Sequence, residues 1–412
     1  MSNSLLTIDM ITKETMRLAH EKASFIGCIY REFDDQYSKT GAKIGDTLRI
    51  RMPNAYTRRK GSRVMDVQDQ SEKNTALTVA TQDGVDMKFN SAELSLSIDE
   101  FSQRHIEPAV SVLVSAIDGD MIAAATKATY NVVGTPGTAV GTVTSGFSDT
   151  TALGLARAKL NQFLAPKDQN RNIHVDSITM ANISNGVKNL FLPSQQIETA
   201  FKEGFIARSA MATFYENDRT YTQAVGSDVT GTTDASNAAV TDGGSSITYD
   251  TTAAVSPNVG DVFTVAGVYA CHPETKQAYT NLQQFVVTAL PGSRVMTVSP
   301  TIYLTGARQN VVTSTGGTLT TANFNNQTLT FVGTASTSYR HNLMFHKEAF
   351  AFATADLPLM ADAASCVRMN KDGLALRVWK GSDIRNDELL MRIDILYGFL
   401  ALRPEWSCRI TN

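Results

Sequence analysis

A long block of the chain, residues 226–338, is poor in charged residues and rich in residues that favour short strands. No Lys or Arg occurs between Arg219 and Lys276, and no charged residue of either sign occurs between Arg308 and Arg340. Thr, Ser, Gly, Val and Asn dominate, a composition that favours strands and turns over helices. Apolar strand cores recur at 262–265, 285–287, 295–298 and 329–332. Four such runs separated by turn signals predict a small β-barrel.

The chain on either side of this block has a mixed α and β pattern. Residues 99–130 predict the longest helix, because apolar residues recur there at helical spacing. Shorter helices are predicted at 7–20 and 152–164, and helix-forming sequence is expected to return at about Tyr339. The core face predicted for the long helix consists of Val112, Leu113, Ala116 and Ile117. We therefore expect an α+β protein in which residues 226–338 are an insertion.

A basic tip follows an alternating strand pattern near the N-terminus. The strand runs from Lys43 to Arg51, Pro53 ends it, and a polar return strand is expected at 76–80. The basic residues of the tip are Arg58, Arg59, Lys60 and Arg63. These features predict a long exposed hairpin, too polar to be core. Because only Tyr56 accompanies the charges, we favour a contact between subunits over DNA contact, which stays the alternative.

Composition excludes some broad classes. Lys and Arg number 37 against 40 Asp and Glu, which argues against a dedicated nucleic-acid-binding protein. The four cysteines show no CxxC spacing, so neither a disulfide framework nor a structural zinc site is expected. The N-terminus has no secretory signal pattern. No apolar run is expected to reach the length of a membrane span, since Arg392 and Asp394 interrupt the best candidate, 389–402.

A search for catalytic motifs finds none. The chain has no HExxH, no GK[ST] and no GxSxG. His341 and His346 would lie about 140° apart on the expected helix and are interpreted as ordinary surface or capping residues. Asp118 and Asp120 point apart in the long helix and are interpreted as part of its solvated face. We expect no enzyme, no cofactor and no metal site.

Several segments, in order along the chain, resemble the major capsid (coat) proteins of tailed bacteriophages. The resemblance implies the branch with an inserted β domain, as in the coat protein of the short-tailed Salmonella phage. Residues 44–53 resemble the strand that enters the family's E-loop, and 99–130 look like its spine helix. Other similar segments are 160–175, 204–217, 260–289, 342–352, 393–398 and 402–405.

The resemblance implies the Hong Kong 97-like capsid fold. Its parts would be an N-terminal arm at 1–40, the E-loop hairpin with its base strands at 41–90, the peripheral (P) domain with the spine helix at 91–180, the first part of the axial (A) domain at 181–225, the inserted β-barrel domain at 226–338, and the closing A- and P-domain strands at 339–412. The inserted domain would stabilise the folding subunit or contact a neighbour, and both options stay open.

The function implied is that of a major capsid protein of a tailed double-stranded DNA phage. Such proteins self-assemble as pentamers and hexamers around a scaffolding protein, with a portal protein, into an icosahedral procapsid. The procapsid expands as DNA is packaged, without sequence-specific binding of the DNA. Assembly is expected in the host bacterial cytoplasm, the final location in the virion capsid, and no membrane partner is expected.

Some relatives carry a cleaved N-terminal scaffold segment, and none is expected here because the capsid-like pattern starts within the first tens of residues.

Two other hypotheses about the function stay open. The alternative is another virion structural β protein, a tail tube or decoration protein, which would lack the spine helix and the hairpin. An enzyme with a β insertion is a third class.

Overall fold

The computed structural model describes most of the chain and divides it into two compact units. The described residues are 8–31, 47–58, 61, 74–90, 102–140, 143–144, 147–148, 151–187, 208–209, 211–235, 240–250, 255–292, 294–360, 365–371, 374–383 and 388–412. The first unit comprises Met1–Arg51, Asn74–Met121 and Phe350–Leu402, and the second comprises Met52–Lys73, Ile122–Ala349 and Arg403–Asn412.

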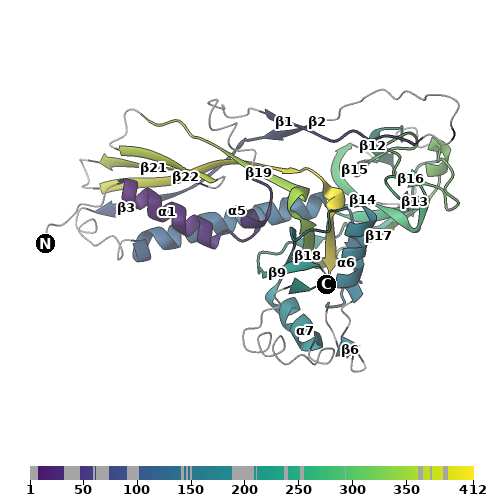
Figure 1. The fold of residues 1–412 in the computed structure, drawn as a ribbon, viewed down its shortest axis with the longest axis horizontal. Coiled ribbons are helices and arrows are strands. Elements are labelled where there is room, and N and C mark those ends of the chain that lie inside the picture. The colour runs from purple at the N-terminus through teal and green to yellow at the C-terminus, as the bar shows by residue number, and fades with distance from the viewer. Residues whose placement is uncertain are drawn as a thin grey trace. The chain divides into compact units, whose positions relative to one another are not determined.

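The first unit is built on a five-stranded antiparallel sheet (Figure 1). Its strands are β3 (Thr81–Asn90), β19 (Phe350–Ala355), β20 (Ser365–Lys371), β21 (Leu374–Asp383) and β22 (Glu388–Ala401). The long strand β22 pairs with β3, β19 and β21. Helix α1 (Ile8–Lys22) packs on β20 and β21. A small apolar cavity between α1, the long helix α5 and the sheet is lined by Leu113 and Ile393, among others.

The outer face of this sheet carries a row of charged and aromatic side chains. Arg377 on β21 lies opposite Asp394 on β22, and the buried pair is joined by two hydrogen bonds, at 3.0 and 2.5 Å. Next to it, Trp379 lies opposite Arg392, which also bonds Asp86 on β3. The guanidinium carbons of Arg377 and Arg392 lie 5.4 and 5.7 Å from the Trp379 ring. The row fixes the register of three strands on the face opposite α1.

The base of the predicted hairpin is anchored by apolar residues. Strands β1 (Thr47–Arg51) and β2 (Asn74–Thr78) pair antiparallel. Ile50, Leu77 and Val79 are buried in a cluster with Ala353 and Leu396 of the first unit. The expectation that the hairpin is too polar to contribute to a core is therefore wrong at its base, where alternation places one face against β19 and β22.

Helix α5 (Glu107–Ala128) follows a five-residue π-helix, Ser102–Ile106. Pro108 stands in its first turn, where a missing N–H costs nothing. Leu113 and Ile117 are buried as predicted, but Val112 is 65% exposed and Ala116 is also exposed. Half of the predicted core face is therefore wrong. Residues 109–117 are apolar almost without interruption, so the spacing alone does not select which arc of the helix meets the core.

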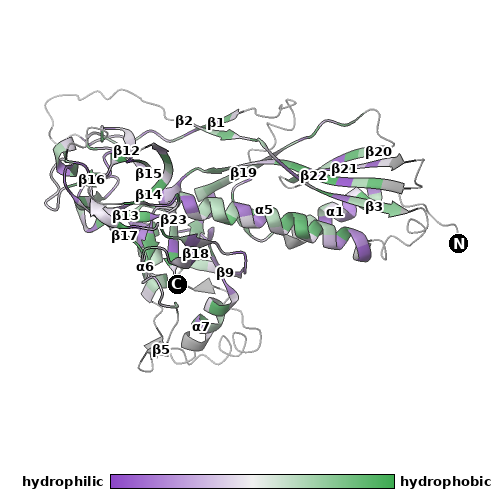
Figure 2. Cartoon of the chain, turned by 180° about the vertical axis from the view of Figure 1, so that it is seen from behind, coloured by the Kyte–Doolittle hydropathy of each residue, from purple (hydrophilic) through white to green (hydrophobic). Residues whose placement is uncertain are grey.

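Helix α5 also bears on the membrane question. Figure 2 shows that it is hydrophobic over most of its length. The segment Arg104–Ala128 is long and apolar enough to span a membrane by composition, so the expectation that no run reaches that length is wrong. Within the protein, 56% of the most apolar 18-residue stretch of this segment is buried, as in the core helix of a folded domain. The segment is therefore weak evidence for a membrane span.

The second unit contains a mixed seven-stranded sheet. Its strands are β4 (Val132–Val133), β7 (Arg171–Val175), β8 (Arg208–Ser209), β9 (Ala212–Glu216), β10 (Thr222–Ala224), β18 (Ser338–His346) and β23 (Ser407–Thr411). The order is β4-β23-β18-β7-β9-β8, with β10 beside β18. Helices α6 (Thr151–Gln162) and α7 (Ser177–Val187) accompany it, with the short pair β5 (Val143–Thr144) and β6 (Phe147–Ser148).

The segment after Ser338 is a strand. The helix expected to start at about Tyr339 is therefore wrong: β18 runs to His346, one short 3-10 turn follows, and β19 begins at Phe350. Residues 341–346 are all buried, because β18 pairs with β23 on one side and β7 on the other. A strand buried on both faces has no polar alternation, so its sequence cannot be told from that of a buried helix.

A second seven-stranded sheet of the same unit forms a closed ring, here called the β module (Thr230–Phe331). Its strands are β11 (Thr230–Thr232), β12 (Gly244–Thr248), β13 (Val262–Cys271), β14 (Ala278–Gly292), β15 (Val295–Ile302), β16 (Val311–Val312) and β17 (Thr328–Phe331). The order β11-β17-β13-β14-β15-β12 is antiparallel throughout, and β16 pairs with β13. Backbone bonds from Asp234 to Thr248 and from Asp250 to Thr232, both 3.0 Å, join the two end strands.

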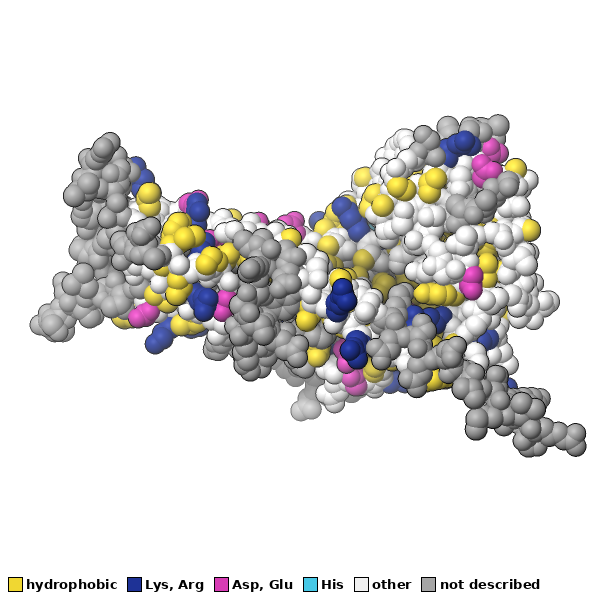
Figure 3. All heavy atoms as spheres, turned by 90° about the horizontal axis from the view of Figure 1, so that it is seen from above, with side chains coloured by type: hydrophobic (Ala, Val, Ile, Leu, Met, Phe, Trp, Pro, Cys, Tyr) yellow, Lys and Arg dark blue, Asp and Glu magenta, His cyan; other side chains and the backbone are white. Residues whose placement is uncertain are grey.

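The β module has its own apolar interior. Phe263, Phe285, Met296 and Phe324 are fully buried in one cluster of seventeen buried apolar residues. Its surface is mostly uncharged, as the white side chains on the right of Figure 3 show. The predicted strand cores correspond to β13, β14, β15 and β17.

Candidate assembly surface and its supporting polar network

The basic hairpin tip lies almost entirely outside the described residues. Arg58 is described and is exposed. Arg59, Lys60 and Arg63 are outside the described part, so the tip as an assembly contact stays a prediction.

A buried carboxylate begins helix α7. Asp176 follows β7 directly, and its side chain accepts hydrogen bonds from the amide of Thr179 (3.3 Å) and from its hydroxyl (2.5 Å). Its carbonyl accepts the amide of Met180 at 2.9 Å. Asp176 is thus the N-cap of α7, which satisfies donors that the first helical turn leaves unpaired.

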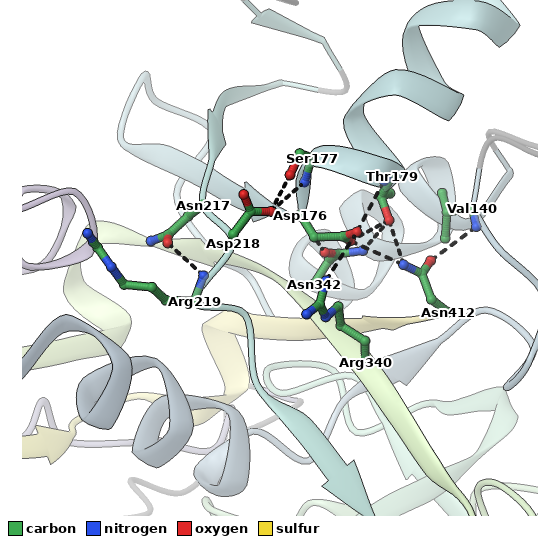
Figure 4. Close-up of polar contacts among 10 residues, drawn as sticks. All are labelled: Val140, Asp176, Ser177, Thr179, Asn217, Asp218, Arg219, Arg340, Asn342 and Asn412. Atoms are coloured by element: carbon green, nitrogen blue, oxygen red, sulfur yellow. Dashed lines mark hydrogen bonds and ion pairs between the residues drawn. The ribbon is translucent and has the colours of Figure 1, made fainter. Parts of the chain in front are cut away.

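Two asparagines brace this cap from the sheet (Figure 4). Asn342 on β18 accepts the amide of Asp176 at 3.1 Å. Asn412 donates to Asp176 (3.3 Å) and to Thr179 (2.5 Å), and its oxygen accepts the amide of Val140 at 3.1 Å. The network therefore ties α7 to three neighbouring segments and fixes its direction relative to the sheet.

The outer edge of the network is charged, and the same turn of α7 carries an exposed apolar residue. Arg340 lies 3.6 Å from Asp176 and is 40% exposed. Asp218 accepts hydrogen bonds from the hydroxyl and the amide of Ser177. These bonds, with a smaller effect of the Arg340 charge, hold the pKa of Asp218 below its usual value, so it is ionised at neutral pH. Ile178, in the same helical turn, is 69% exposed. An exposed apolar side chain in a helical turn that also carries charged groups is a feature of the kind that protein partners bury.

The two histidines of β18 are buried, so their interpretation as surface residues is wrong, whereas the interpretation as a capping residue holds for His346, which caps the 3-10 turn Lys347–Ala349. His346 is 2% exposed, and its Nδ1 accepts the amide of Glu348 at 3.3 Å. Its Nε2 therefore carries the proton and donates to Asp168 at 3.1 Å. Burial alone would raise the pKa of Asp168, but hydrogen bonds from Asn170 and His346 lower it overall. The edge-on ring of Trp406 lies 5.5 Å from the imidazole.

His341 lies next to a buried cation. Burial, and then the positive charge of Arg409, lower the pKa of His341 to about 3. His341 is therefore neutral at physiological pH. His341 is buried because β18 lies between β23 and β7 in the sheet, a position that the predicted helix does not have.

Asp118 was also misplaced on the solvated face of α5. Its carboxylate is fully buried in the first unit and accepts hydrogen bonds from the amides of Ser24 (3.2 Å), Phe25 (3.1 Å) and Ile26 (3.1 Å) and from the Ser24 hydroxyl (2.8 Å). It anchors the short helix α2 (Phe25–Cys28). Asp120 is exposed as predicted. No local pattern marks Asp118, because its partners lie more than ninety positions away in the sequence.

Catalytic chemistry is not evident in the described part of the chain. No group of three or more His, Cys, Asp and Glu side chains there could hold a metal ion. His272, next to Cys271, accepts the amides of Glu274 and Thr275 within a turn. The structure thus offers interaction surfaces and their internal supports.

Comparison with known proteins identifies the family. A family model described as the P22 coat protein (gene protein 5) matches residues 36–408. The chain belongs to the P22 coat protein family. It is thereby a member of a phage coat protein family, and its fold is of the mixed α+β class. The alternative of a tail tube or decoration protein is set aside, and α5 and the β1–β2 hairpin are both present.

Solved phage structures are similar to this coat protein over most of its length. One from Mycobacterium phage Che8 is 10% identical, with 94% of this chain and 90% of that chain covered and a TM-score of 0.48. The capsids of Ralstonia phage GP4 (6% identity, 91% and 85% covered, TM-score 0.44) and Cyanophage P-SCSP1u (11% identity, 90% and 84% covered, TM-score 0.40) are further examples. No functional argument rests on likenesses this distant. No curated protein matches the chain.

Proposed function

We propose that this coat protein is the shell-forming subunit of a tailed double-stranded DNA phage. Many copies assemble as pentamers and hexamers around a scaffolding protein, with a portal protein, into an icosahedral procapsid that expands on DNA packaging. The work is structural and involves no catalysis, and it begins in the host bacterial cytoplasm. The observation that carries the proposal is the family match over residues 36–408.

Residues 226–338 serve in this proposal as the inserted domain. The pairing of β10 with β18 supports this, because Ala224 and Ser338 are direct partners and the chain thus leaves and re-enters the sheet at adjacent points. Backbone bonds between Val225 and Thr337 (3.0 Å) and between Gly226 and Ser336 (3.0 Å) continue the pairing into the neck. Adjacent ends are what the insertion of a whole domain requires.

Two surfaces are proposed to join neighbouring subunits. The first is the basic hairpin tip, where charge sets register between partners. The second is the exposed Ile178 at the start of α7, together with Asp218 and Arg340, which contact the preceding residues of that turn. A rigid support makes such a contact effective, because little side-chain or backbone freedom is lost on binding.

Electron microscopy of the purified chain mixed with its scaffolding protein tests the shell proposal. Closed icosahedral particles are expected. A chain that stays monomeric at high concentration with its scaffold present would contradict the proposed function.

Charge reversal tests the hairpin tip. The triple variant Arg58→Glu, Arg59→Glu and Arg63→Glu should fold but give few particles, with the largest deficit at low salt. The matched triple Arg→Lys variant keeps the charge and should assemble normally. Normal particle yield from the Glu variant would rule out the tip as a contact.

A polar substitution tests the α7 surface. Ile178→Ser should leave the fold intact and lower the particle yield. Leu155→Ser, which removes a second exposed leucine-sized side chain from α6, is the control and should have no effect. An equal loss from both variants would show that Ile178 has no particular role.

A further inference from the structure

A fully buried arginine joins the β module to the end of the long helix. Arg409 on β23 donates from Nη1 to the carbonyl of Gly260 at 2.7 Å, in the turn that leads into β13. Its Nη2 donates to the carbonyl of Lys127 at 3.3 Å, in the last turn of α5. A cation at this place satisfies a carbonyl that the helix end leaves unpaired and opposes the negative end of its dipole. One side chain thus holds both the helix terminus and the module.

The residue after Gly260 supplies the matching negative charge. Asp261 is buried and accepts hydrogen bonds from the amides of Gly226 (2.9 Å) and Asn258 (2.8 Å) and from the side chain of Gln223 (2.9 Å). Its carboxylate therefore links residues 223–226, where the chain enters the module, to the turn that leads into β13. Arg409 and Asp261 share no direct hydrogen bond among the described contacts, and they interact as charges.

The charge of Arg409 survives its burial. Desolvation lowers the pKa of Arg409 to about 9, and the nearby Asp261 charge opposes this shift. Arg409 is therefore a cation at neutral pH. Its Nε has no hydrogen-bond partner within the described residues, so the two carbonyls and the Asp261 charge are its main compensation. Removing any of them exposes a buried charge to full desolvation cost.

Further contacts join the β module to the segment that follows α5. The side chain of Gln284 on β14 makes two hydrogen bonds with the backbone of Val132: it accepts the amide at 3.0 Å and donates to the carbonyl at 2.9 Å. Tyr130 and Val132 share an apolar cluster with Val262 and Val286 of the module. The interface between the module and residues 130–132 therefore combines an apolar contact with hydrogen bonds, unlike the loose attachment expected of an appended domain.

We propose that Arg409 is a positioning residue that locks the β module to the C-terminal turn of α5, so that the helix end and the module open and close together as one cooperative body. The proposal concerns the folded chain alone and does not depend on shell assembly. Its failure would leave the proposed function untouched.

Hydrogen–deuterium exchange on the full chain tests the lock. In Arg409→Met, amides of 122–133 (the end of α5 and β4) and of 256–261 (the turn that leads into β13) should lose at least about tenfold in protection, and to a similar extent. Strand β15 of the module, Val295–Ile302, should be unchanged because it pairs with β12 and β14 and does not contact Arg409. Arg409→Lys, which keeps the charge but not the forked donor geometry, should show the same pattern more weakly.

A charge-rescue variant separates positioning from simple packing. Adding Asp261→Asn to Arg409→Met removes the carboxylate left without its cation, and protection of 122–133 should partly recover. A packing role alone predicts no recovery. Arg377→Met, which removes a buried arginine of the first unit, is the matched control and should leave both peptides unchanged.

Three outcomes would overturn the proposal. They are unchanged protection of 122–133 in Arg409→Met, loss of protection in 256–261 without loss at the helix end, and the absence of any rescue by Asp261→Asn. If Arg409→Met fails to fold, Arg409→Lys carries the comparison of 122–133 with 256–261, and adding Asp261→Asn, which takes the carboxylate away from the remaining cation, should lower the protection of both peptides further.

Discussion

Replacing Asp118 by alanine should destabilise the first unit severely, although Asp118 lies on a helix whose sequence marks it as exposed. The carboxylate accepts four hydrogen bonds from the segment Ser24–Ile26, and three of the donors are backbone amides. Alanine removes every acceptor atom at once. The short helix α2 would then begin with buried N–H groups that have lost their cap.

The size of the effect follows from which donors can reach water. Phe25 and Ile26 are buried, whereas Ser24 is half-buried and can be rehydrated. Each buried donor left without a partner costs about 1–3 kcal/mol, so Asp118→Ala should lose about 2–6 kcal/mol of unfolding free energy. Asp118→Asn keeps one acceptor oxygen without the charge and should lose roughly half as much. A domain is stable by only about 5–15 kcal/mol, so the larger loss approaches full unfolding.

Guanidinium denaturation combined with hydrogen exchange measures this effect. Asp118→Ala should lower the unfolding midpoint and strip protection from the peptide 23–31. The control is Asp120→Ala, two positions along the same helix and exposed, which should change stability by less than about 0.5 kcal/mol. Equal stabilities of the Asp118 and Asp120 variants would refute the argument that the buried carboxylate anchors α2.

Three further outcomes are expected. Because the pKa of His341 is depressed from 6.5 to about 3, stability of the second unit should be complete above pH 6.5 and fall as the pH drops toward 3, by up to about 1.4 kcal/mol per pH unit; urea titrations at several pH values should show this slope, and His341→Gln should flatten it. Leu113→Asp should misfold or aggregate because it buries an unpaired charge, whereas Val112→Asp, at an exposed neighbouring position, should give normal soluble yield and melting temperature; a normal Leu113→Asp protein would show that the assigned face is wrong. Gln284→Glu can still accept from Val132 but cannot donate, and should lower the melting temperature by several degrees; an unchanged melting temperature would show that the grip contributes nothing.

Local sequence patterns predict where the helices and strands of this fold occur better than they predict which of their side chains are buried. The strand cores at 262–265 and 295–298 are strands because turn signals bound short β-branched runs, a purely local property. The helix α5 is likewise local. Its buried arc is not, since Val112 and Leu113 are equally apolar and only the sheet beneath decides which of them is covered.

The misassigned polar residues share one physical cause, which is burial by segments that are distant in the sequence. His341 and His346 lie on a strand flanked by two others, so the usual alternation is missing and the segment is typical of a helix. Asp118 is satisfied by a segment far away in the sequence, and Arg409 by a turn nearly one hundred and fifty residues distant. Long-range polar pairing leaves no periodic trace, so the cap and the lock appear only in the folded chain.

The chain contains two tryptophans, and the fold assigns one to each unit. Trp379 lies between two guanidinium groups of the first unit, and Trp406 of the second unit has Arg403 4.2 Å from its ring. Indole emission is sensitive to nearby charge and to water, so the native protein carries a separate optical probe in each half. Trp379→Phe and Trp406→Phe would each leave a single emitter. The order in which the two halves melt, or respond to acid, could then be followed in solution and in assembled particles without attaching a dye.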